Sequence, residues 1–354
     1  MARVVPPPGN IIVRTVLRYV AIAVVVLCAV GAAYQSISSA RDAQRFPMPG
    51  ERIDIGGRAL HLYCSGSGPV TVLLENGLGA NFSAWQRVQP EIAQFSRVCS
   101  YDRAGLGWSD VSDRPTRAEY VTDDLHRLLT AAQLSGPFVL VGWSAGGVFV
   151  RRYYHDYPDG VIGMVFVDSS HEQQKLRLEE SPDMQQMERD MSQQLNVCRA
   201  LAWSGLVRAL GVMQANTAAA HLPQALEAQT VALANRTGFC GGIAHESAGF
   251  QSDVSQSQPP ASLGDLPLIV LTRGRRSTPE DFPQPLPQAT LDRLDQSWLA
   301  LQDELAALST HVSHRTAADS GHAIPLQAPN AVIEAIRDII DARLTGVVRA
   351  GRSP

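Results

Sequence analysis

The sequence predicts an α/β fold, a doubly wound and mostly parallel sheet of eight strands that is interrupted by a helical cap. Its short apolar runs, rich in β-branched and aliphatic residues, are typical of strands buried on both faces. They alternate with stretches of helical spacing, which favours helices on both sides of the sheet. From 171 to 261 no strand is evident, and about 90 residues are too many for a simple crossover. The 354 residues therefore divide into an N-terminal export segment at 1–40, a core at 46–170 and 262–348, and a cap at 171–261.

The strands are predicted from runs of apolar residues and from one turn. Gly56-Gly57 separates the first two runs, which is the pattern of a β-hairpin. The last run is weaker than the others. The predicted strands are 52–55, 59–64, 70–74, 96–101, 138–141, 161–167, 268–271 and 315–318.

Three helices are expected between or after these strands. The stretch 116–133 places five apolar side chains on one face, and 148–157 is similar. The third helix covers 331–344, and Pro329-Asn330 is a typical opening for it.

The N-terminal segment has the pattern of an export signal. Residues 19–33 are all apolar or small, three arginines precede them, and no acidic residue occurs before Asp42. Two readings follow: an uncleaved signal anchor that holds the protein to the membrane, or a signal peptide cleaved before Tyr34. Either reading places the rest of the chain outside the cytoplasm, anchored or secreted.

Composition excludes several classes of function. Lys+Arg number 30 and Asp+Glu 34, giving a net charge of −4, and no basic stripe indicates nucleic-acid binding. Lys175 is the single lysine and follows no glycine, so a P-loop is excluded. The pairs His171-Glu172 and His245-Glu246 begin an H-E-x-x-H pattern that Lys175 and Gly249 leave incomplete. We expect neither a metal nor a cofactor.

The strongest motif surrounds Ser144. This serine lies between Gly142 and Gly146, after a predicted buried strand and before a predicted helix. A nucleophile elbow needs this composition, because the serine adopts a strained positive φ and the residues two positions away must be small. Ser144 is therefore the candidate nucleophile.

A serine nucleophile needs a base and an acid that orients it. His322 follows the last strand, so the topology of a doubly wound sheet brings it to the same carboxyl edge as Ser144. His311 and His314 precede that predicted strand. For the acid we favour Asp168, directly after the strand 161–167, over Glu280 and Asp281, which a longer loop separates from their strand.

Two backbone N–H groups are candidates for an oxyanion hole. One belongs to Ala145, directly after the nucleophile. The other belongs to Leu78, in a loop where Gly77 and Gly79 let the backbone approach a substrate.

In combination these motifs resemble the α/β-hydrolase fold superfamily. The resemblance implies Ser144 as nucleophile, His322 as base, and Leu78 and Ala145 as oxyanion donors. It also implies that Asp102-Arg103 stabilises a loop beside the site. The residues that carry it are NGLG at 76–79 with Trp85, YDRAGLGWS at 101–109, GWSAGG at 142–147, VD at 167–168 and SGH at 320–322.

The sequence departs from the family pattern at two positions. The oxyanion loop, which commonly begins His-Gly in the family, begins Asn76-Gly77 here. Many members carry their acid shortly after the seventh strand, where this chain has Arg275 and Arg276. That leaves Asp168, at a position that some members use instead.

The resemblance also bears on the cysteines. Cys28 lies in the N-terminal segment, and four others remain. In the family's usual strand order the second and fourth strands are neighbours, which would pair Cys64 with Cys99. Cys198 would then pair with Cys240 in the cap. Four free thiols are the alternative.

The sequence thus predicts a serine hydrolase that acts on a carboxylic ester or a related acyl compound, a partly apolar small molecule. A second hypothesis is a weakly catalytic or non-catalytic ligand-binding protein of the same fold. Amidase, peptidase, acyltransferase and cofactor-free haloperoxidase activities are further alternatives.

Overall fold

The computed structural model describes residues 8–178, 181–214, 224–253, 260–282 and 284–345. The chain forms two compact units. The helical unit consists of Met1–Pro47 and Val197–Thr237, and the sheet unit of Met48–Asn196 and Gly238–Pro354. This division differs from the predicted boundaries at 40, 170 and 261, which stay predictions.

An eight-stranded sheet forms the centre of the sheet unit, so the predicted fold class is confirmed. The strand order is β1-β2-β4-β3-β5-β6-β7-β8. β2 pairs antiparallel with both β1 and β4, and all other neighbouring strands are parallel. The strands are β1 (Glu51–Asp54), β2 (Ala59–Ser65), β3 (Thr71–Glu75), β4 (Arg97–Tyr101), β5 (Phe138–Trp143), β6 (Val161–Val167), β7 (Leu268–Arg273) and β8 (Val312–Ala317).

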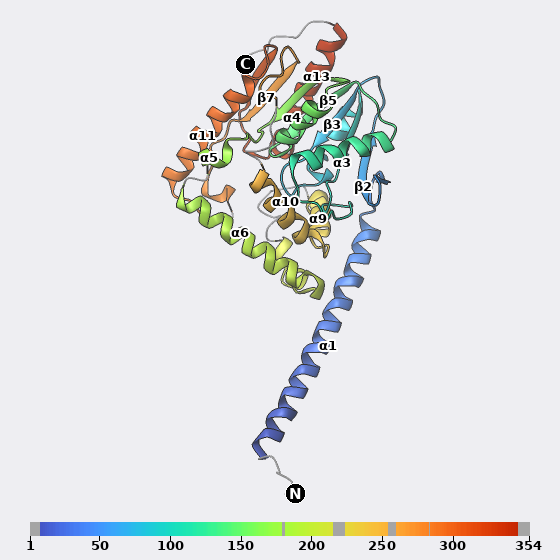
Figure 1. Ribbon diagram of the computed structural model, residues 1–354, viewed down its shortest axis with the longest axis vertical. Coiled ribbons are helices and arrows are strands. Elements are labelled where there is room, and N and C mark those ends of the chain that lie inside the picture. Colours follow the sequence, from blue (N-terminus) through green and yellow to red (C-terminus); the bar gives the residue numbers. More distant parts are fainter. Residues whose placement is uncertain (1–7, 179–180, 215–223, 254–259, 283, 346–354) are drawn as a thin grey trace. The chain divides into compact units, whose positions relative to one another are not determined.

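Helices cover both faces of this sheet, because the central strands are apolar on both sides. Along β5, Leu140 belongs to one core, whereas Val139 and Val141 belong to the other. In Figure 1 the helices α3 and α4 lie in front of β3 and β5. The first core includes side chains of α3 (Ala118–Ala131), α4 (Gly146–Asp156) and α11 (Gln288–Ala306), and the second those of α2 (Gln89–Ile92), α12 (Ile324–Gln327) and α13 (Pro329–Thr345).

The sequence analysis placed the start of the last strand too late. β8 begins at Val312, so His314 lies inside the strand rather than before it. This strand is at the edge of the sheet, and its side chains alternate between more and less exposed positions. An edge strand of this kind carries polar residues and no continuous apolar run, which is why the pattern search missed its first half.

Between β6 and β7 the described residues are helical or irregular, as predicted for the insertion. The sheet unit contributes α5 (Gln174–Leu178), most of α6 (Pro182–Leu201) and α10 (Phe239–Asp253). The helical unit contributes η2 (Ala202–Ser204), α7 (Leu206–Ala209) and α9 (Gln224–Ala234). α11 was not predicted, although it has apolar residues at helical spacing.

The helical unit is organised around α1 (Pro8–Arg45). Its stretch Val13–Arg45 is long enough to cross a membrane and contains a run that is apolar enough to do so. Beyond the apolar run, Gln35 is only 3% exposed and donates to the Asn235 carbonyl over 2.7 Å. Arg208 pairs with Asp42 at 2.6 Å. These polar contacts attach the second half of α1 to the rest of the helical unit.

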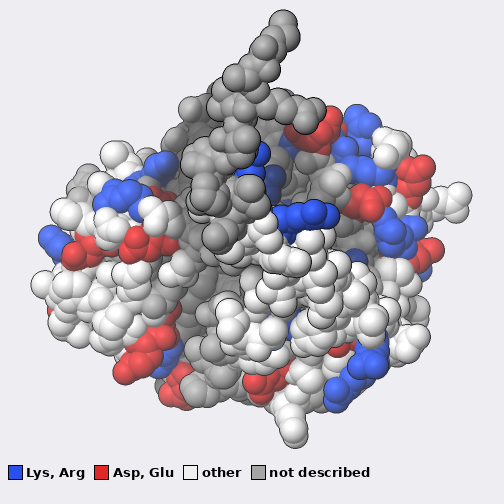
Figure 2. All heavy atoms as spheres, turned by 90° about the horizontal axis from the view of Figure 1, so that it is seen from below, with Lys and Arg blue, Asp and Glu red and all other residues white. Residues whose placement is uncertain are grey.

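Charged side chains of both signs are interspersed on the face seen in Figure 2. A mixed surface of this kind generates no long-range field of one sign over the described part of that face.

The structure bears on both predicted cysteine pairs and on Cys28. Cys64 and Cys99 are partners in the β2–β4 register and form a disulfide, as predicted. Cys198 and Cys240 are each disulfide-bonded as well. Cys28, in α1, is a free cysteine.

We therefore expect one reactive thiol in the unreduced, denatured protein. Alkylation followed by mass spectrometry should add a single label, at Cys28, and reduction beforehand should raise the number to five. Labels on Cys64 or Cys99 without reduction would contradict the bridge between β2 and β4.

Candidate active site

Ser144 lies in the sharp turn between β5 and α4. Its φ is 54°, a left-handed conformation that is rare outside glycine. The turn is so tight that a Cβ at Gly142 would lie 2.6 Å from the Gly146 carbonyl oxygen, and one at Gly146 would lie 2.5 Å from the Glu75 carbonyl oxygen. The glycines therefore make possible the conformation that exposes the serine hydroxyl.

His322 and Asp168 lie in line with this hydroxyl. The Nε2 atom of His322 lies 3.0 Å from Ser144 Oγ, and its Nδ1 atom lies 2.6 Å from Asp168 Oδ2. With Nδ1–H donating to the carboxylate, Nε2 is left as the acceptor that faces the hydroxyl. Strands β5, β6 and β8 end at the same edge of the sheet, and each is followed by one of these residues.

Of the three acids considered from the sequence, Asp168 contacts His322 in the part of the chain that the structure describes. Asp281 instead pairs with Arg275 at 2.6 Å and accepts hydrogen bonds from Thr278. Partial burial would raise the pKa of Asp281, but the hydrogen bonds from Arg275 and Thr278 and the charge of Arg275 outweigh it and lower the pKa to about 2. Glu280 lies beside it in the same short 3-10 helix, Pro279–Asp281.

Asp168 is fully buried and surrounded by donors. Besides His322, it accepts hydrogen bonds from Trp298 Nε1 at 2.9 Å, from the Arg273 backbone N–H at 3.1 Å and from Arg273 Nη1 at 3.1 Å. Burial alone would raise the pKa of Asp168, but the His322 hydrogen bond and the charges of His322 and Arg273 outweigh it, so the pKa is lowered. The carboxylate therefore stays ionised where it holds the imidazole.

The sequence analysis missed Arg273 and Trp298. Arg273 ends β7 and is also held by Asp295, which lies 3.1 Å from its Nη2 atom, and Trp298 packs beneath its guanidinium. A signal for α11, and so for Trp298, was present in the sequence. It is the series of buried apolar residues at three- and four-residue spacing, Leu291, Leu294, Trp298, Leu301 and Leu305.

The loop after β3 lies directly beside Ser144. A Cβ at Gly77 would lie 3.2 Å from Ser144 Cβ, so the backbone passes close to the hydroxyl. Neither the Leu78 nor the Ala145 N–H has a hydrogen-bond partner among the described residues. The two side chains belong to one apolar cluster.

Asp102 and Arg103, which the family resemblance places beside the site, bind the same region of the chain. Asp102 accepts from the Phe82 N–H at 2.7 Å and lies 2.7 Å from His61 Nδ1. Arg103 donates to the carbonyl oxygens of Asn76 at 2.8 Å and of Gly77 at 2.6 Å. Both residues are buried, so these bonds fix the loops around Ser144.

A cavity of about 440 Å³ opens onto Ser144 and His322. Part of its lining is apolar, and the residues Leu178, Met184, Phe282 and Leu294 belong to a single cluster of α5, α6 and α11 with the segment before α11. The lining also includes the charged residues Arg273, Arg275 and Asp281. The cavity has the volume and the mixture of surfaces expected for a small-molecule site.

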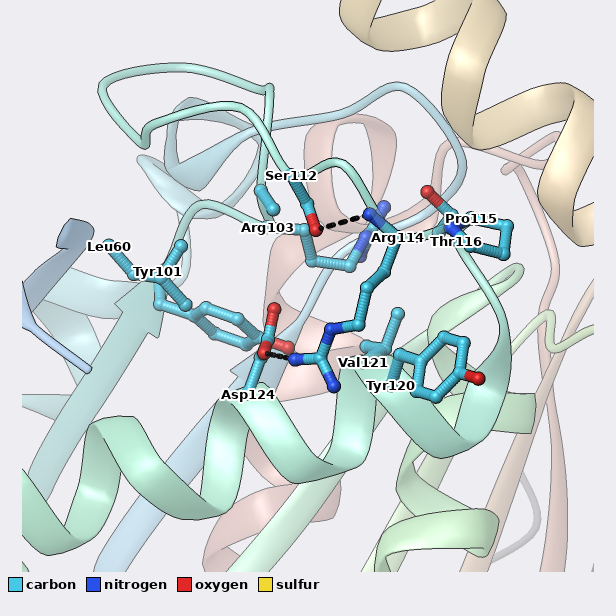
Figure 3. A pocket seen from close by; sticks show the side chains of 11 residues that line it. Leu60, Tyr101, Arg103, Ser112, Arg114, Pro115, Thr116, Tyr120, Val121 and Asp124 are labelled. Atoms are coloured by element: carbon cyan, nitrogen blue, oxygen red, sulfur yellow. Dashed lines mark hydrogen bonds and ion pairs between the residues drawn. The ribbon is translucent and has the colours of Figure 1, made fainter. Parts of the chain in front are cut away.

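A second hollow is lined by Arg103 and its neighbours and is too small for a substrate. Its volume is about 20 Å³, close to that of one water molecule. Figure 3 shows Arg114 extending across it toward Asp124, with which it pairs at 2.8 Å. The hollow is therefore a packing defect beside an ion pair.

Comparisons with known proteins agree with this architecture. Residues 70–202 match the family model described as alpha/beta hydrolase fold. An AB hydrolase superfamily protein of Gibberella zeae is 33% identical over 108 residues, 29% of this chain and 33% of that protein. The matched stretches cover less than half the length of the first curated relatives, between 15% and 46%.

Solved structures extend the likeness over most of the chain. A thermophilic esterase from Thermogutta terrifontis is 21% identical, with a TM-score of 0.55, covering 82% of this chain and 97% of that one. A variant epoxide hydrolase from Bacillus megaterium is 15% identical, with a TM-score of 0.59, covering 82% and 100%. Together with the family model over 70–202 and the strand order, these findings show that the chain has the α/β-hydrolase fold.

Proposed function

We propose that this protein is a serine hydrolase that cleaves a carboxylic ester or a related acyl compound through an acyl-enzyme. The observation that carries the proposal is the line of three groups at one edge of the sheet. His322 lies 3.0 Å from the Ser144 hydroxyl oxygen and 2.6 Å from the Asp168 carboxylate. A nucleophile, a base and an orienting acid need this geometry.

In the first half of the reaction, Ser144 Oγ attacks the carbonyl carbon while its proton passes to His322 Nε2. Asp168 stabilises the imidazolium through Nδ1–H. The tetrahedral intermediate collapses when the bond to the leaving alcohol breaks, and His322 returns the proton to that alcohol. The acyl group is then bonded to Ser144.

In the second half, His322 takes a proton from a water molecule, whose oxygen attacks the acyl carbon. Collapse of the second intermediate breaks the bond to Ser144, returns the proton to Oγ and releases the carboxylic acid. The N–H groups of Leu78 and Ala145 have no acceptor among the described residues. They would bind the oxyanion in both intermediates, because Leu78 follows Gly77, whose backbone passes beside Ser144, and Ala145 follows Ser144 directly. No cofactor is needed for either half.

The cavity supports a partly apolar substrate. Leu178, Met184, Phe282 and Leu294 offer an apolar wall that an acyl chain can cover. One structural neighbour is an epoxide hydrolase. In this fold, the opening of an epoxide ring commonly uses a carboxylate as the nucleophile. Here the turn after β5 presents a serine hydroxyl, which favours acyl transfer to water.

A fluorophosphonate probe tests the proposal, together with a panel of p-nitrophenyl esters from acetate to octanoate. The wild-type protein should be labelled at Ser144 and should hydrolyse the panel. Ser144→Ala and His322→Ala should lose labelling and at least about 10³-fold of turnover. A folded wild-type protein with no Ser144-dependent labelling or turnover would refute the hydrolase and favour a ligand-binding role.

The assignment of the acid has its own test, since three carboxylates were candidates. Asp168→Asn should lower kcat by about 10⁴-fold, because an amide no longer holds the imidazole in the productive tautomer. Asp281→Asn and Glu280→Gln, the matched controls, should change kcat by less than about threefold, since an exposed ion pair contributes little. Activity that survives in Asp168→Asn and collapses in a control would move the acid to the loop after β7.

We further propose that α1 anchors the protein in a membrane with the sheet unit outside the cytoplasm. The support is the apolar stretch of α1, the arginines before it and the disulfide between Cys64 and Cys99, which an oxidising compartment allows. The buried contact of Gln35 and the partly buried ion pair of Asp42 tie the end of this helix to the rest of the helical unit.

The alternative is cleavage before Tyr34, and fractionation separates the two. An anchored protein should stay in the membrane pellet after an alkaline carbonate wash, with its N-terminal segment detected by mass spectrometry. A mature form in the soluble fraction that begins at Tyr34 would contradict the anchor.

A further inference from the structure

One face of α10 rests directly on the loops beside the active site. Gly242, His245, Glu246 and Gly249 share this face, because their spacing follows the helical repeat. A Cβ at Gly242 would collide with the Gly105 carbonyl oxygen, and one at Gly249 would lie 2.5 Å from that of Thr116. The two glycines therefore allow the helix to approach the core closely enough for the side chain between them to reach inside.

That side chain is Glu246, which is only 1% exposed. Its Oε1 atom accepts from Arg103 Nε at 2.5 Å, and its Oε2 atom accepts from the backbone N–H of Gly79. Glu246 thus binds the loop 76–79 directly and also through Arg103. From the sequence it belonged only to an incomplete metal-binding pattern, and the hydrolase mechanism leaves it without a role.

Arg103 extends the same connection along the loop. It donates to the carbonyl oxygens of Asn76 and Gly77 and pairs with Glu75, at the end of β3. Burial disfavours its charge, but Glu246 and Glu75 outweigh that effect and raise the pKa of Arg103. The guanidinium is therefore a permanently charged link between α10 and three consecutive residues before Leu78.

The apolar contacts of α10 lead to the same place. Phe250, one turn after Glu246, packs edge to face on Phe149, with ring centroids 5.9 Å apart. This pair belongs to the cluster that contains Ala145 and Leu78, the residues on either side of the proposed oxyanion position. Polar and apolar contacts of one helix thus converge on the two donors.

We propose that Glu246 is a positioning residue: it transmits the docked position of α10 to the loop 76–79 and so sets where the Leu78 N–H points. Stabilisation of the oxyanion then depends on a residue of the insertion, and a displaced α10 would lower the rate of acyl transfer without blocking the cavity. This inference rests on the proposed hydrolase function and names a determinant of its rate.

The test compares Glu246→Ala and Glu246→Gln with His245→Gln on the same face of α10. His245 lies 2.8 Å from the Arg114 carbonyl oxygen and, among the described residues, makes no hydrogen bond to the loop 76–79, so its loss should weaken docking alone. Steady-state kinetics, thermal denaturation and hydrogen exchange of the peptide that contains 76–79 are measured for each protein.

We expect Glu246→Ala to lower kcat by about 100-fold with KM within about threefold, because misplaced donors act on the transition state. Glu246→Gln keeps an acceptor for the Gly79 N–H but loses the charge opposite Arg103. Its kcat should therefore lie between that of the wild-type protein and that of Glu246→Ala. Hydrogen exchange of the loop should quicken in the same order. His245→Gln should retain wild-type kcat and loop exchange.

A purely structural role for Glu246 would appear as lower melting temperatures with kcat and loop exchange unchanged in the folded protein, and that outcome would overturn the inference. So would an equal loss of kcat in His245→Gln. The exchange measurement needs no turnover. If the wild-type protein proved inactive, the hydrolase proposal would fail, while unchanged exchange in Glu246→Ala would separately refute the link to the loop.

Discussion

The turn at Ser144 is the constraint on which the rest of the site depends. A non-glycine residue with a φ of 54° costs about 1–3 kcal/mol, so the surrounding structure must hold it. The surrounding sheet holds it in place, because β5 is buried on both faces and the Ser144 N–H donates to the Val167 carbonyl oxygen at 3.1 Å. At the start of α4, Gly146 has no side chain, so the helix lies directly against the backbone of Glu75. Burial of β5 thus fixes the position of the Ser144 hydroxyl independently of its contacts with His322.

A second strained residue faces the first. Asp168 has a φ of 40°. The strained residues that follow β5 and β6 thus both contact His322, through the Ser144 hydroxyl and the Asp168 carboxylate. The carboxylate is fully buried, and its ionised form persists because Arg273, Trp298 and His322 all donate to it. Arg275 and Arg276 stand where the family resemblance would place an acid after β7. Arg273, at the end of β7, supports the acid on the neighbouring strand.

Local patterns predicted most of the fold and the three aligned residues, because buried strands and a glycine-flanked serine are readable within a few positions. The parts that escaped depend on distant contacts or exposed positions. The start of β8 was misplaced because an edge strand needs no apolar run. Arg273 and Trp298 reach Asp168 from 105 and 130 residues away, and Glu246 meets Arg103 across 143. No spacing rule relates such residues before the chain has folded.

The most direct measurement is a crystal structure of the protein after reaction with a p-nitrophenyl alkylphosphonate, whose tetrahedral adduct mimics the acyl-transfer intermediate. Our account predicts phosphorus bonded to Ser144 Oγ. It also predicts the phosphoryl oxygen within about 3.1 Å of both the Leu78 and Ala145 amide nitrogens, and the alkyl chain along Leu178 and Phe282. Phosphorus on another residue, or an oxygen that neither amide reaches, would contradict it.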